Sequence, residues 1–369
     1  MGQLPTVEDV ARVAQVSRQT VSNVLNTPDI VRPETRDRVR AAIDQLGYRP
    51  HASARRLRTQ KSSTIGVRLD PLQNGISGGV LDRFLHALTE QADARNMRIL
   101  LYTAPDHEGE IEQIRRLLDG ADVDAFVLTA TSYDDPRTDW LLERRVPFVT
   151  FGRPWGVDDM SDPKHLWVDV DGFSGAREAT EHLLRRAGRR VAFLGWPHGS
   201  GTGDDRRRGW LAAMGDAGVP EAELAGLEEA AEDRVVEARK AVERLIQTGG
   251  GLPDALVAAS DTLALGALMV ASGIGRPDLP IVGFDNTPIA QALGISSVEQ
   301  RVDQVAEGAL QLLMGETGSS VVTHDFGSGD PKHRLITPKL VVRRSSHLAP
   351  AEEAGGTESG NHNRKDKQR

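Results

Sequence analysis

The chain contains 369 residues, of which 39% are hydrophobic and 27% charged, and it has no cysteine. The composition supplies enough apolar material for a large core, and the length predicts two or three folding units. The absence of cysteine excludes a disulfide scaffold, thiolate metal sites and a cysteine nucleophile. No run of about 18 apolar residues occurs, which excludes a transmembrane helix. The N-terminus lacks the features of a secretory signal, so we expect a cytoplasmic location.

The net charge of −8 is unevenly distributed along the chain. Residues 1–61 carry 11 basic and 6 acidic side chains, a net charge of +5, which leaves −13 on the remainder. A basic head on an acidic body is typical of a nucleic-acid-binding module joined to a second function.

Residues 1–49 show the pattern of three short helices. Thr6 begins the first helix as a capping residue with an acid three positions later, and Ser17 begins the second. Pro33 suits the first turn of the third helix, and Gly47 suits its end. The tight break between the first two helices predicts a helix-turn-helix, whose second helix meets base edges with its N-terminal residues.

The second helix exposes hydrogen-bonding side chains and no acidic ones. Arg18 can form paired hydrogen bonds with guanine, and Gln19 can do so with adenine. An ordinary three-helix bundle with a polar surface is the alternative, which the sign and placement of the charges disfavour.

This head closely resembles the DNA-binding head of LacI/GalR-type bacterial transcription regulators, through TVEDVARVAQVSRQTVSNVLN and VRPETRDRVRAAIDQLGYRPHASARRLRTQKSSTIGV. Two positions depart from the family pattern: Gln15 replaces a usual glycine, and Arg32 replaces a usual capping serine. The resemblance implies that Arg18 and Asn23 set the operator preference. The expected DNA contacts in the head are Thr6, Ser17, Arg18, Gln19, Thr20, Ser22, Asn23 and Asn26.

Residues 50–61 form a basic segment that is too short for a stable isolated helix. Composition alone favours a solvated linker. The resemblance instead implies a hinge helix that folds on the operator beside the hinge of a dimer mate. Leu57 would then wedge into a central minor-groove step. The expected DNA contacts here are His51, Ala54, Arg55, Leu57 and Arg58.

Residues 62–345 alternate short apolar runs with amphipathic helical stretches, which predicts parallel sheets covered by helices in two lobes. The expected strands are residues 64–67, 97–101, 125–128, 147–150, 190–194, 255–258 and 281–284, and the expected helices are residues 82–95, 108–118, 175–187, 234–248 and 262–272. No leucine heptad repeat follows the body, so we do not expect a tetramerising coiled coil, and a homodimer is the default. Residues 346–369 are polar and are predicted to be a disordered tail.

The body also resembles that of the LacI/GalR family, through HLLRRAGRRVAFLGW, RRRGW, VAASDTLALGAL, IVGFDN and SSVEQRVDQVAEGALQLL. That body is similar to periplasmic sugar-binding proteins, with two Rossmann-like lobes and a ligand cleft between them. The expected fold is therefore an all-α helix-turn-helix head followed by a two-lobed α/β body.

Several residues are candidates for effector contacts. Asp261 and Asp285 end strand-like runs, where α/β folds bind ligands, although either could instead cap a helix. Arg206 begins RxxGW, and the resemblance implies that it faces the effector. Three tryptophans, expected in loops or sheet edges, could stack on a sugar or belong to the core. The complete expected set is Asn74, Arg153, Trp155, Trp196, Arg206, Trp210, Asp261, Asp285 and Gln300.

These features predict a repressor that binds a pseudo-palindromic operator of about 20 bp and is released by a sugar. Small residues in DPLQNGISGG favour a di- or oligosaccharide. A regulator whose DNA binding is strengthened by a ligand or partner protein is the first alternative. A solute-binding protein is the second, and the DNA-binding head disfavours it. We expect no enzyme, no cofactor and no metal, because GSGTGDD lacks the phosphate-loop pattern and neither HExxH nor GxSxG occurs.

Overall fold

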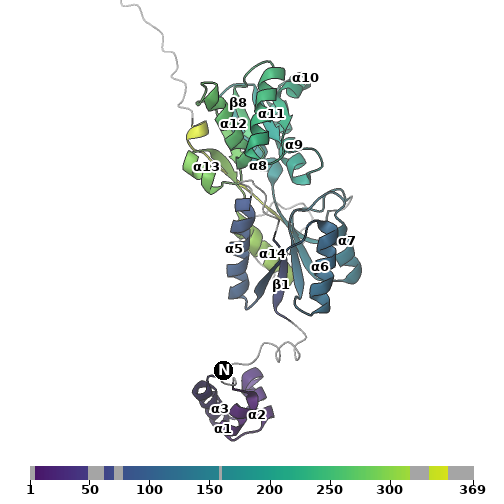
Figure 1. Ribbon diagram of the computed structural model, residues 1–369, viewed down its shortest axis with the longest axis vertical. Coiled ribbons are helices and arrows are strands. Elements are labelled where there is room, and N and C mark those ends of the chain that lie inside the picture. The colour runs from purple at the N-terminus through teal and green to yellow at the C-terminus, as the bar shows by residue number, and fades with distance from the viewer. Residues whose placement is uncertain (1–4, 49–61, 70–77, 158–159, 316–331, 348–369) are drawn as a thin grey trace, which may run out of the picture. The chain divides into compact units, whose positions relative to one another are not determined.

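The computed structural model describes residues 5–48, 62–69, 78–157, 160–315 and 332–347 (Figure 1). The chain divides into two compact units, Met1–Ser62 and Ser63–Arg369, which are the head and the body. Within the described residues, no helix is both long and apolar enough to cross a membrane.

The head is a bundle of three helices, as predicted. Its elements are α1 (Val7–Ala14), α2 (Arg18–Asn26), a short 3₁₀ turn (Pro28–Ile30) and α3 (Pro33–Leu46). Thr6 and Asp9 form a reciprocal capping box at the start of α1, and the Ser17 hydroxyl caps α2. Arg32 provides no side-chain cap for α3, which agrees with the loss of the family's serine. A small apolar core holds the bundle, formed by Val10, Ala11, Ala14, Val21, Val24, Val39, Ala42 and Tyr48.

Gln15 forms the turn between α1 and α2. It has a φ of 54°, in the left-handed region, and its N–H donates to the carbonyls of Ala11 and Arg12. A glycine would reach this conformation without a steric cost, so Gln15 adopts a backbone that its side chain disfavours.

Lobe 1 of the body is a parallel sheet with strand order β11-β5-β4-β3-β1-β2. Figure 1 shows α5 and α14 on one side of this sheet and α6 and α7 on the other. The strands are β1 (Thr64–Arg68), β2 (Arg98–Tyr102), β3 (Ala125–Leu128), β4 (Phe148–Phe151), β5 (Leu166–Val170) and β11 (His333–Ile336). The helices are α5 (Gly78–Ala94), α6 (His107–Asp119), α7 (Pro136–Arg144) and α14 (Val302–Met314).

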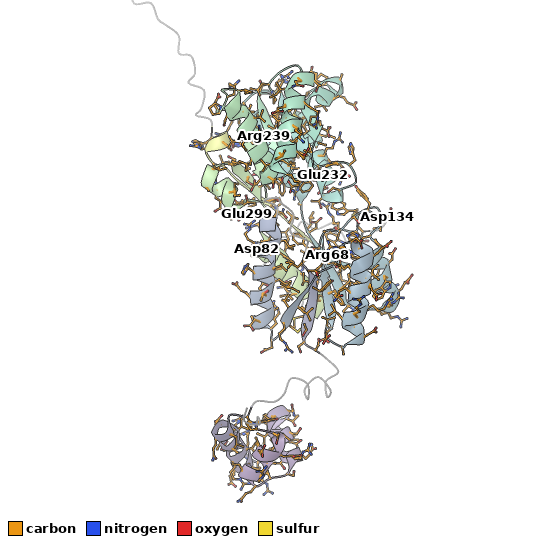
Figure 2. The ribbon with its side chains drawn as sticks, in the orientation of Figure 1. Arg68, Asp82, Asp134, Glu232, Arg239 and Glu299 are labelled. Carbon is orange, nitrogen blue, oxygen red and sulfur yellow. The ribbon has the colours of Figure 1, made fainter. Side chains whose placement is uncertain are left out.

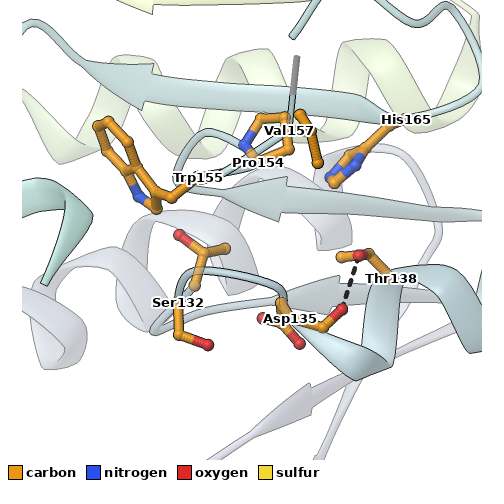
Figure 3. Close-up of a pocket in the computed structure, with 8 residues that line it drawn as sticks. Ser132, Asp135, Thr138, Pro154, Trp155, Val157 and His165 are labelled. Atoms are coloured by element: carbon orange, nitrogen blue, oxygen red, sulfur yellow. Dashed lines mark hydrogen bonds between the residues drawn. The ribbon is translucent and has the colours of Figure 1, made fainter. Parts of the chain in front are cut away.

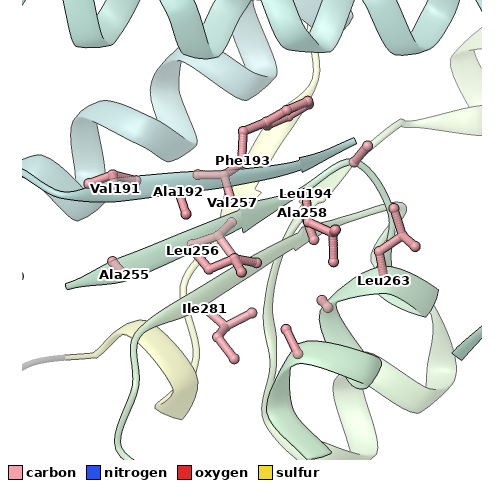
Figure 4. Close-up of a cluster of buried hydrophobic side chains, with 14 of the residues drawn as sticks. Val191, Ala192, Phe193, Leu194, Ala255, Leu256, Val257, Ala258, Leu263 and Ile281 are labelled. Atoms are coloured by element: carbon pink, nitrogen blue, oxygen red, sulfur yellow. The ribbon is translucent and has the colours of Figure 1, made fainter. Parts of the chain in front are cut away.

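Lobe 2 repeats the architecture with strand order β12-β10-β9-β8-β6-β7, in which only β12 is antiparallel to its neighbour among the described strands. Figure 4 shows the core between β6, β8, β9 and the start of α12. The strands are β6 (Val191–Gly195), β7 (Glu228–Ala230), β8 (Ala255–Ala258), β9 (Ile281–Phe284), β10 (Ser296–Glu299) and β12 (Lys339–Val341). The helices are α8 (Gly172–Leu184), α9 (Gly201–Asp216), α10 (Glu221–Leu224), α11 (Val235–Thr248), α12 (Asp261–Gly273) and α13 (Pro288–Leu293), with 3₁₀ turns at Ala225–Leu227 and Arg344–Ser346.

The chain passes between the lobes three times: from β5 to α8, from β10 to α14, and from β11 to β12. Because β5 leaves lobe 1 at its carboxyl end and β10 leaves lobe 2 at its carboxyl end, the carboxyl edges of both parallel sheets face the lobe boundary. Figure 2 shows Arg68 and Asp134 at the edge of lobe 1 nearest lobe 2, and Glu299 on the opposing side. Ligands of open α/β sheets bind at such edges, so the boundary between the lobes is the candidate ligand site.

Candidate DNA-binding and effector sites

Helix α2 presents the polar side chains expected of a DNA-reading helix. Arg18 and Gln19 are exposed in its first turn. Gln19 Nε2 donates to Asn23 Oδ1 at 3.0 Å, and an Arg18 nitrogen lies 2.9 Å from Glu8 Oε1 in an exposed ion pair. Exposed pairs of this kind contribute little to stability, so both side chains can be redirected to bases at small cost.

The remaining head candidates differ in how freely they can reach DNA. Thr6 and Asp9 bind one another in the capping box, and the Ser17 and Thr20 hydroxyls lie 2.9 Å apart. Asn26 donates to the Ser22 carbonyl at 2.6 Å. The hinge candidates His51, Ala54, Arg55, Leu57 and Arg58, together with the effector candidate Asn74, lie outside the described residues.

Arg206 lies at the lobe boundary and is only 3% exposed. Its guanidinium carbon lies 3.7 Å from the centroid of the Phe284 ring and 5.0 Å from that of Trp196. One terminal nitrogen lies 3.8 Å from Asp285 Oδ1 and also donates to the Ala259 carbonyl, whereas Nε has no hydrogen-bond partner among the described residues. Burial lowers the pKa of Arg206, and the nearby aspartates oppose this effect.

Asp285 follows β9 with a φ of 109°, and its side chain is buried. Its carboxylate accepts a hydrogen bond from Gln300 Nε2, in the crossing from β10 to α14. Its backbone carbonyl accepts one from Arg83 of α5 at 2.6 Å, which links lobe 2 to lobe 1. Burial raises the pKa of Asp285 to about 8, and the positive charge of Arg206 opposes this shift. Such a perturbed group at a sheet edge is typical of a functional site.

Arg153 follows β4 and reaches across the same boundary. Its Nε donates to Asp169 Oδ2 of β5 at 2.9 Å, and a terminal nitrogen donates to Asp205 of α9. Its guanidinium carbon lies 4.4 Å from the centroid of the Trp155 ring. The Phe173 N–H also donates to Asp205, at 3.1 Å. Arg153 therefore connects a strand of lobe 1 to a helix of lobe 2.

The same boundary holds a second set of contacts around the start of α9. The Trp155 ring of lobe 1 packs directly against Gly201, where a β-carbon would come within 2.2 Å of the indole. The Tyr133 hydroxyl donates to Asp204 at 3.1 Å. The first turns of α9 thus dock on the loops that follow β3 and β4.

Comparison with known proteins identifies the chain's relatives. The family of bacterial regulatory proteins called the lacI family matches residues 6–51, and the periplasmic binding protein-like domain matches residues 180–346. The HTH-type transcriptional regulator CelR of Thermobifida fusca is 32% identical over 358 residues, covering 92% of this chain and 98% of CelR. The chain belongs to the LacI family of DNA-binding transcriptional regulators.

Solved structures of LacI-family regulators show the same architecture. A complex of the regulator CelR with cellobiose has a TM-score of 0.65 at 29% identity, covering 92% of this chain and 99% of that one. A lac repressor dimer bound to operator and the anti-inducer ONPF has a TM-score of 0.74 at 21% identity, covering 94% and 100%. This LacI-family regulator therefore has the fold that the sequence predicted, a helix-turn-helix head followed by a two-lobed α/β body.

Two of the effector candidates have structural roles instead. Trp210 is fully buried within α9, stacks on Phe193 with a centroid distance of 5.6 Å, and donates from Nε1 to the Val191 carbonyl. The prediction that Trp210 stacks on a sugar is wrong, because its ring belongs to the core of lobe 2.

Asp261 begins α12, which Ser260 caps, and its carboxylate is fully engaged. It accepts hydrogen bonds from the Thr287 N–H at 2.7 Å, the Thr287 hydroxyl at 2.9 Å and the Ser297 hydroxyl at 2.6 Å. It braces the loop after β9, so the alternative of a structural aspartate is the one that the geometry supports.

Sequence reasoning missed Asp169, Asp205 and Arg83 as residues of the lobe boundary. Asp169 lies inside β5, one residue before its end, and this strand was not among those expected, so the rule that selected Asp285 could not have found it. Asp205 directly precedes Arg206 and lies on the same helix. The local sequence gives no sign that Arg83 lies at the boundary, because the residue that it contacts, Asp285, is 202 positions away in the chain.

A small pocket lies entirely within lobe 1 (Figure 3). Its lining residues are Thr131, Ser132, Asp135, Thr138, Pro154, Trp155, Val157 and His165. The cavity volume of about 10 Å³ suits one water molecule and is too small for a sugar. No three His, Asp or Glu side chains are placed to hold a metal ion in the part of the chain that the structure describes.

Proposed function

We propose that this regulator is a repressor that leaves its operator when a di- or oligosaccharide binds between the two lobes. The observation that carries the proposal is the buried group of Arg206, Asp285 and Gln300 beside the Trp196 and Phe284 rings. The similarity to CelR, whose structure was solved with cellobiose, supports a sugar of this class.

The chemistry of this group suits a polyhydroxyl ligand. The Arg206 guanidinium, whose buried Nε is unpartnered, can form charge-assisted hydrogen bonds with sugar hydroxyls, and the Asp285 carboxyl can exchange hydrogen bonds with a neighbouring hydroxyl. The aromatic rings supply surfaces for the apolar C–H face of a sugar. Discrimination would be strong, because buried polar groups left without partners penalise a wrong ligand.

Effector binding requires movement of the lobes, since Arg206 and Asp285 are each 3% exposed. We propose that the change in lobe angle is transmitted to the two DNA-binding heads of a dimer and weakens operator binding. Allosteric coupling of this kind is typically worth about 1–3 kcal/mol, a change of about 5- to 150-fold in operator affinity.

A homodimer would cover large apolar side chains that lobe 2 exposes. These are Val236 of α11, Met269 of α12, Ile274 directly after α12, and Ile289 and Leu293 of α13. Large exposed apolar side chains are candidates for an interaction surface. A second copy of the chain is the occupant that also supplies the second head for a pseudo-palindromic operator.

The test is fluorescence anisotropy of a labelled duplex from the gene's upstream region that contains a pseudo-palindrome. The salt concentration is fixed, because affinity depends steeply on it. Addition of cellobiose or another disaccharide is expected to raise the Kd for DNA, whereas glucose alone is not. Tightening by a ligand would instead establish a co-repressor system, and no response to any sugar would refute the effector class.

Arg206→Ala is expected to abolish the sugar response and leave DNA binding in sugar-free buffer intact. The matched control is Arg207→Ala on the same helix, whose side chain pairs with Glu228 away from the lobe boundary. A normal sugar response in Arg206→Ala would show that the effector binds elsewhere.

A further inference from the structure

Arg153 joins the two lobes through a pair of buried carboxylates. Asp169, from its own lobe, accepts from Nε at 2.9 Å, and Asp205, from the other lobe, accepts from a terminal nitrogen. All three side chains are less than 10% exposed. Removal of one partner of such a pair is strongly destabilising, because the other is left as a buried uncompensated charge.

The neighbouring contacts place this pair at the edge where α9 docks on lobe 1. Trp155 covers Gly201, and Tyr133 binds Asp204, within the same first turns of α9 that carry Asp205. Arg206 follows directly in the chain. Separation of the lobes at this edge would therefore expose the effector residues, and the Arg153–Asp205 pair holds this edge closed.

We propose that Arg153 is an internal latch that holds the two lobes together without a sugar and that an effector must displace. The proposal rests on the proposed function only in naming the effector. Without Arg153, the carboxylates of Asp169 and Asp205 would repel one another across the boundary and favour separated lobes. The guanidinium also covers a face of the Trp155 ring, with 4.4 Å between its central carbon and the ring centroid.

This arrangement specifies what a displacing ligand has to offer. It needs hydroxyl donors for Asp169 and Asp205 and an apolar C–H face for Trp155, which a pyranose ring presents together. Arg206 and Asp285 lie at the same boundary, and Arg206 directly follows Asp205 in the chain, so a ligand that displaces the latch can also engage this second pair.

The latch can be tested by measuring the distance between the lobes in the full-length protein. The chain contains no cysteine, so Asp119→Cys on α6 and Glu243→Cys on α11 introduce two unique spin-label sites. Both side chains are exposed. Pulsed electron–electron double resonance then gives the interlobe distance. Singly labelled chains give the distances between the copies of a dimer, so that these can be told apart from the interlobe distance.

Arg153→Gln is expected to lengthen and broaden the interlobe distance distribution in sugar-free buffer. The control is Arg208→Gln, because Arg208 also binds Asp205, at 2.8 Å, but from the same helix and with its side chain exposed. Its distribution is expected to match that of the parent. An unchanged distribution in Arg153→Gln would overturn the latch. If Arg153→Gln does not fold, Asp205→Asn tests the same pair and keeps Arg153 bound to Asp169.

A second readout separates a latch from an ordinary sugar contact. Removal of a latch is expected to lower the Kd for a disaccharide several-fold, because the sugar no longer competes with the guanidinium. A Kd at least tenfold higher, with unchanged lobe distance, would make Arg153 a ligand contact and refute the proposal. Because the distance measurement needs no sugar, it decides the latch even if no sugar alters operator binding and the proposed function fails.

Discussion

Substitution of Gly201 by alanine places a wedge between the two lobes. The new β-carbon would come within 2.2 Å of the Trp155 ring, whereas ordinary van der Waals contact begins at 3.4 Å, so the two must separate by roughly 1.2 Å. Trp155 is only 2% exposed and cannot rotate freely away. Overpacking of this kind costs about 1–3 kcal/mol, which the helix preference for alanine over glycine offsets by at most about 1 kcal/mol. We expect a net destabilisation of about 1–2 kcal/mol.

Thermal unfolding followed by circular dichroism measures this loss. About 1 kcal/mol lowers the Tm by about 2–4 °C in domains of 150–250 residues, so Gly201→Ala is expected to melt a few degrees below the parent. The matched control is Gly215→Ala on the same helix, where a β-carbon meets nothing within 4 Å and the Tm is expected to rise. If Gly201→Ala were as stable as Gly215→Ala, the docking of Trp155 on α9 would contribute nothing to the fold.

Three further changes test separate parts of the molecule. Gln15→Gly relieves a left-handed backbone and is expected to stabilise the head by up to about 1 kcal/mol, seen as roughly fivefold slower amide exchange in α1 and α2. Unchanged exchange would mean that the turn is unstrained. Asp285→Asn removes a carboxyl whose pKa is raised to about 8 by burial. Since such a group binds more protons folded than unfolded, the parent loses stability as pH rises toward 8. The Tm of the variant relative to the parent should therefore increase from pH 5 to pH 9, and a decrease would show that attraction to Arg206 outweighs burial. Trp210→Ala is expected to cost about 3–5 kcal/mol as a core truncation. A stable variant that loses only sugar binding would restore its role as a platform.

The sequence predicts those strands that consist of a continuous run of apolar residues. Ala125–Leu128 and Ala255–Ala258 have the expected bounds, because both lie inside a parallel sheet and are apolar throughout. Five strands escaped prediction: Leu166–Val170, Glu228–Ala230, Ser296–Glu299, His333–Ile336 and Lys339–Val341. Each is interrupted or begun by polar residues and so lacks a continuous apolar run, and the second and last lie at sheet edges, where few apolar residues are needed. The helix α9 begins at Gly201, inside the glycine-rich stretch GSGTGDD, and is not among the helices expected from the sequence. Its capping by Ser200 and its docking on Trp155 outweigh its low helix propensity.

The candidate site was predictable in part. Asp285 and Gln300 follow the neighbouring strands β9 and β10 and meet at one edge of the sheet, and Arg206 reaches Asp285 from α9. The role of Trp210 was not predictable, since a tryptophan beside a binding motif has the same local sequence whether it faces a ligand or Phe193. The partners of Arg153 were missed because an ion pair between lobes depends on how two sheets approach, which no local pattern encodes.

The threefold passage of the chain between the lobes also constrains how the protein is made. Lobe 1 takes β11 and α14 from residues beyond 300, and α14 packs along α5 and the sheet. During vectorial synthesis, residues 63–170 therefore emerge without the helix and the edge strand that complete their core. Lobe 2 in turn waits for β10 and β12. The head, whose contacts are local, can fold as soon as it leaves the ribosome, whereas both lobes must be completed together near the end of translation. Late truncations should consequently leave a folded DNA-binding head attached to an unfolded, aggregation-prone body.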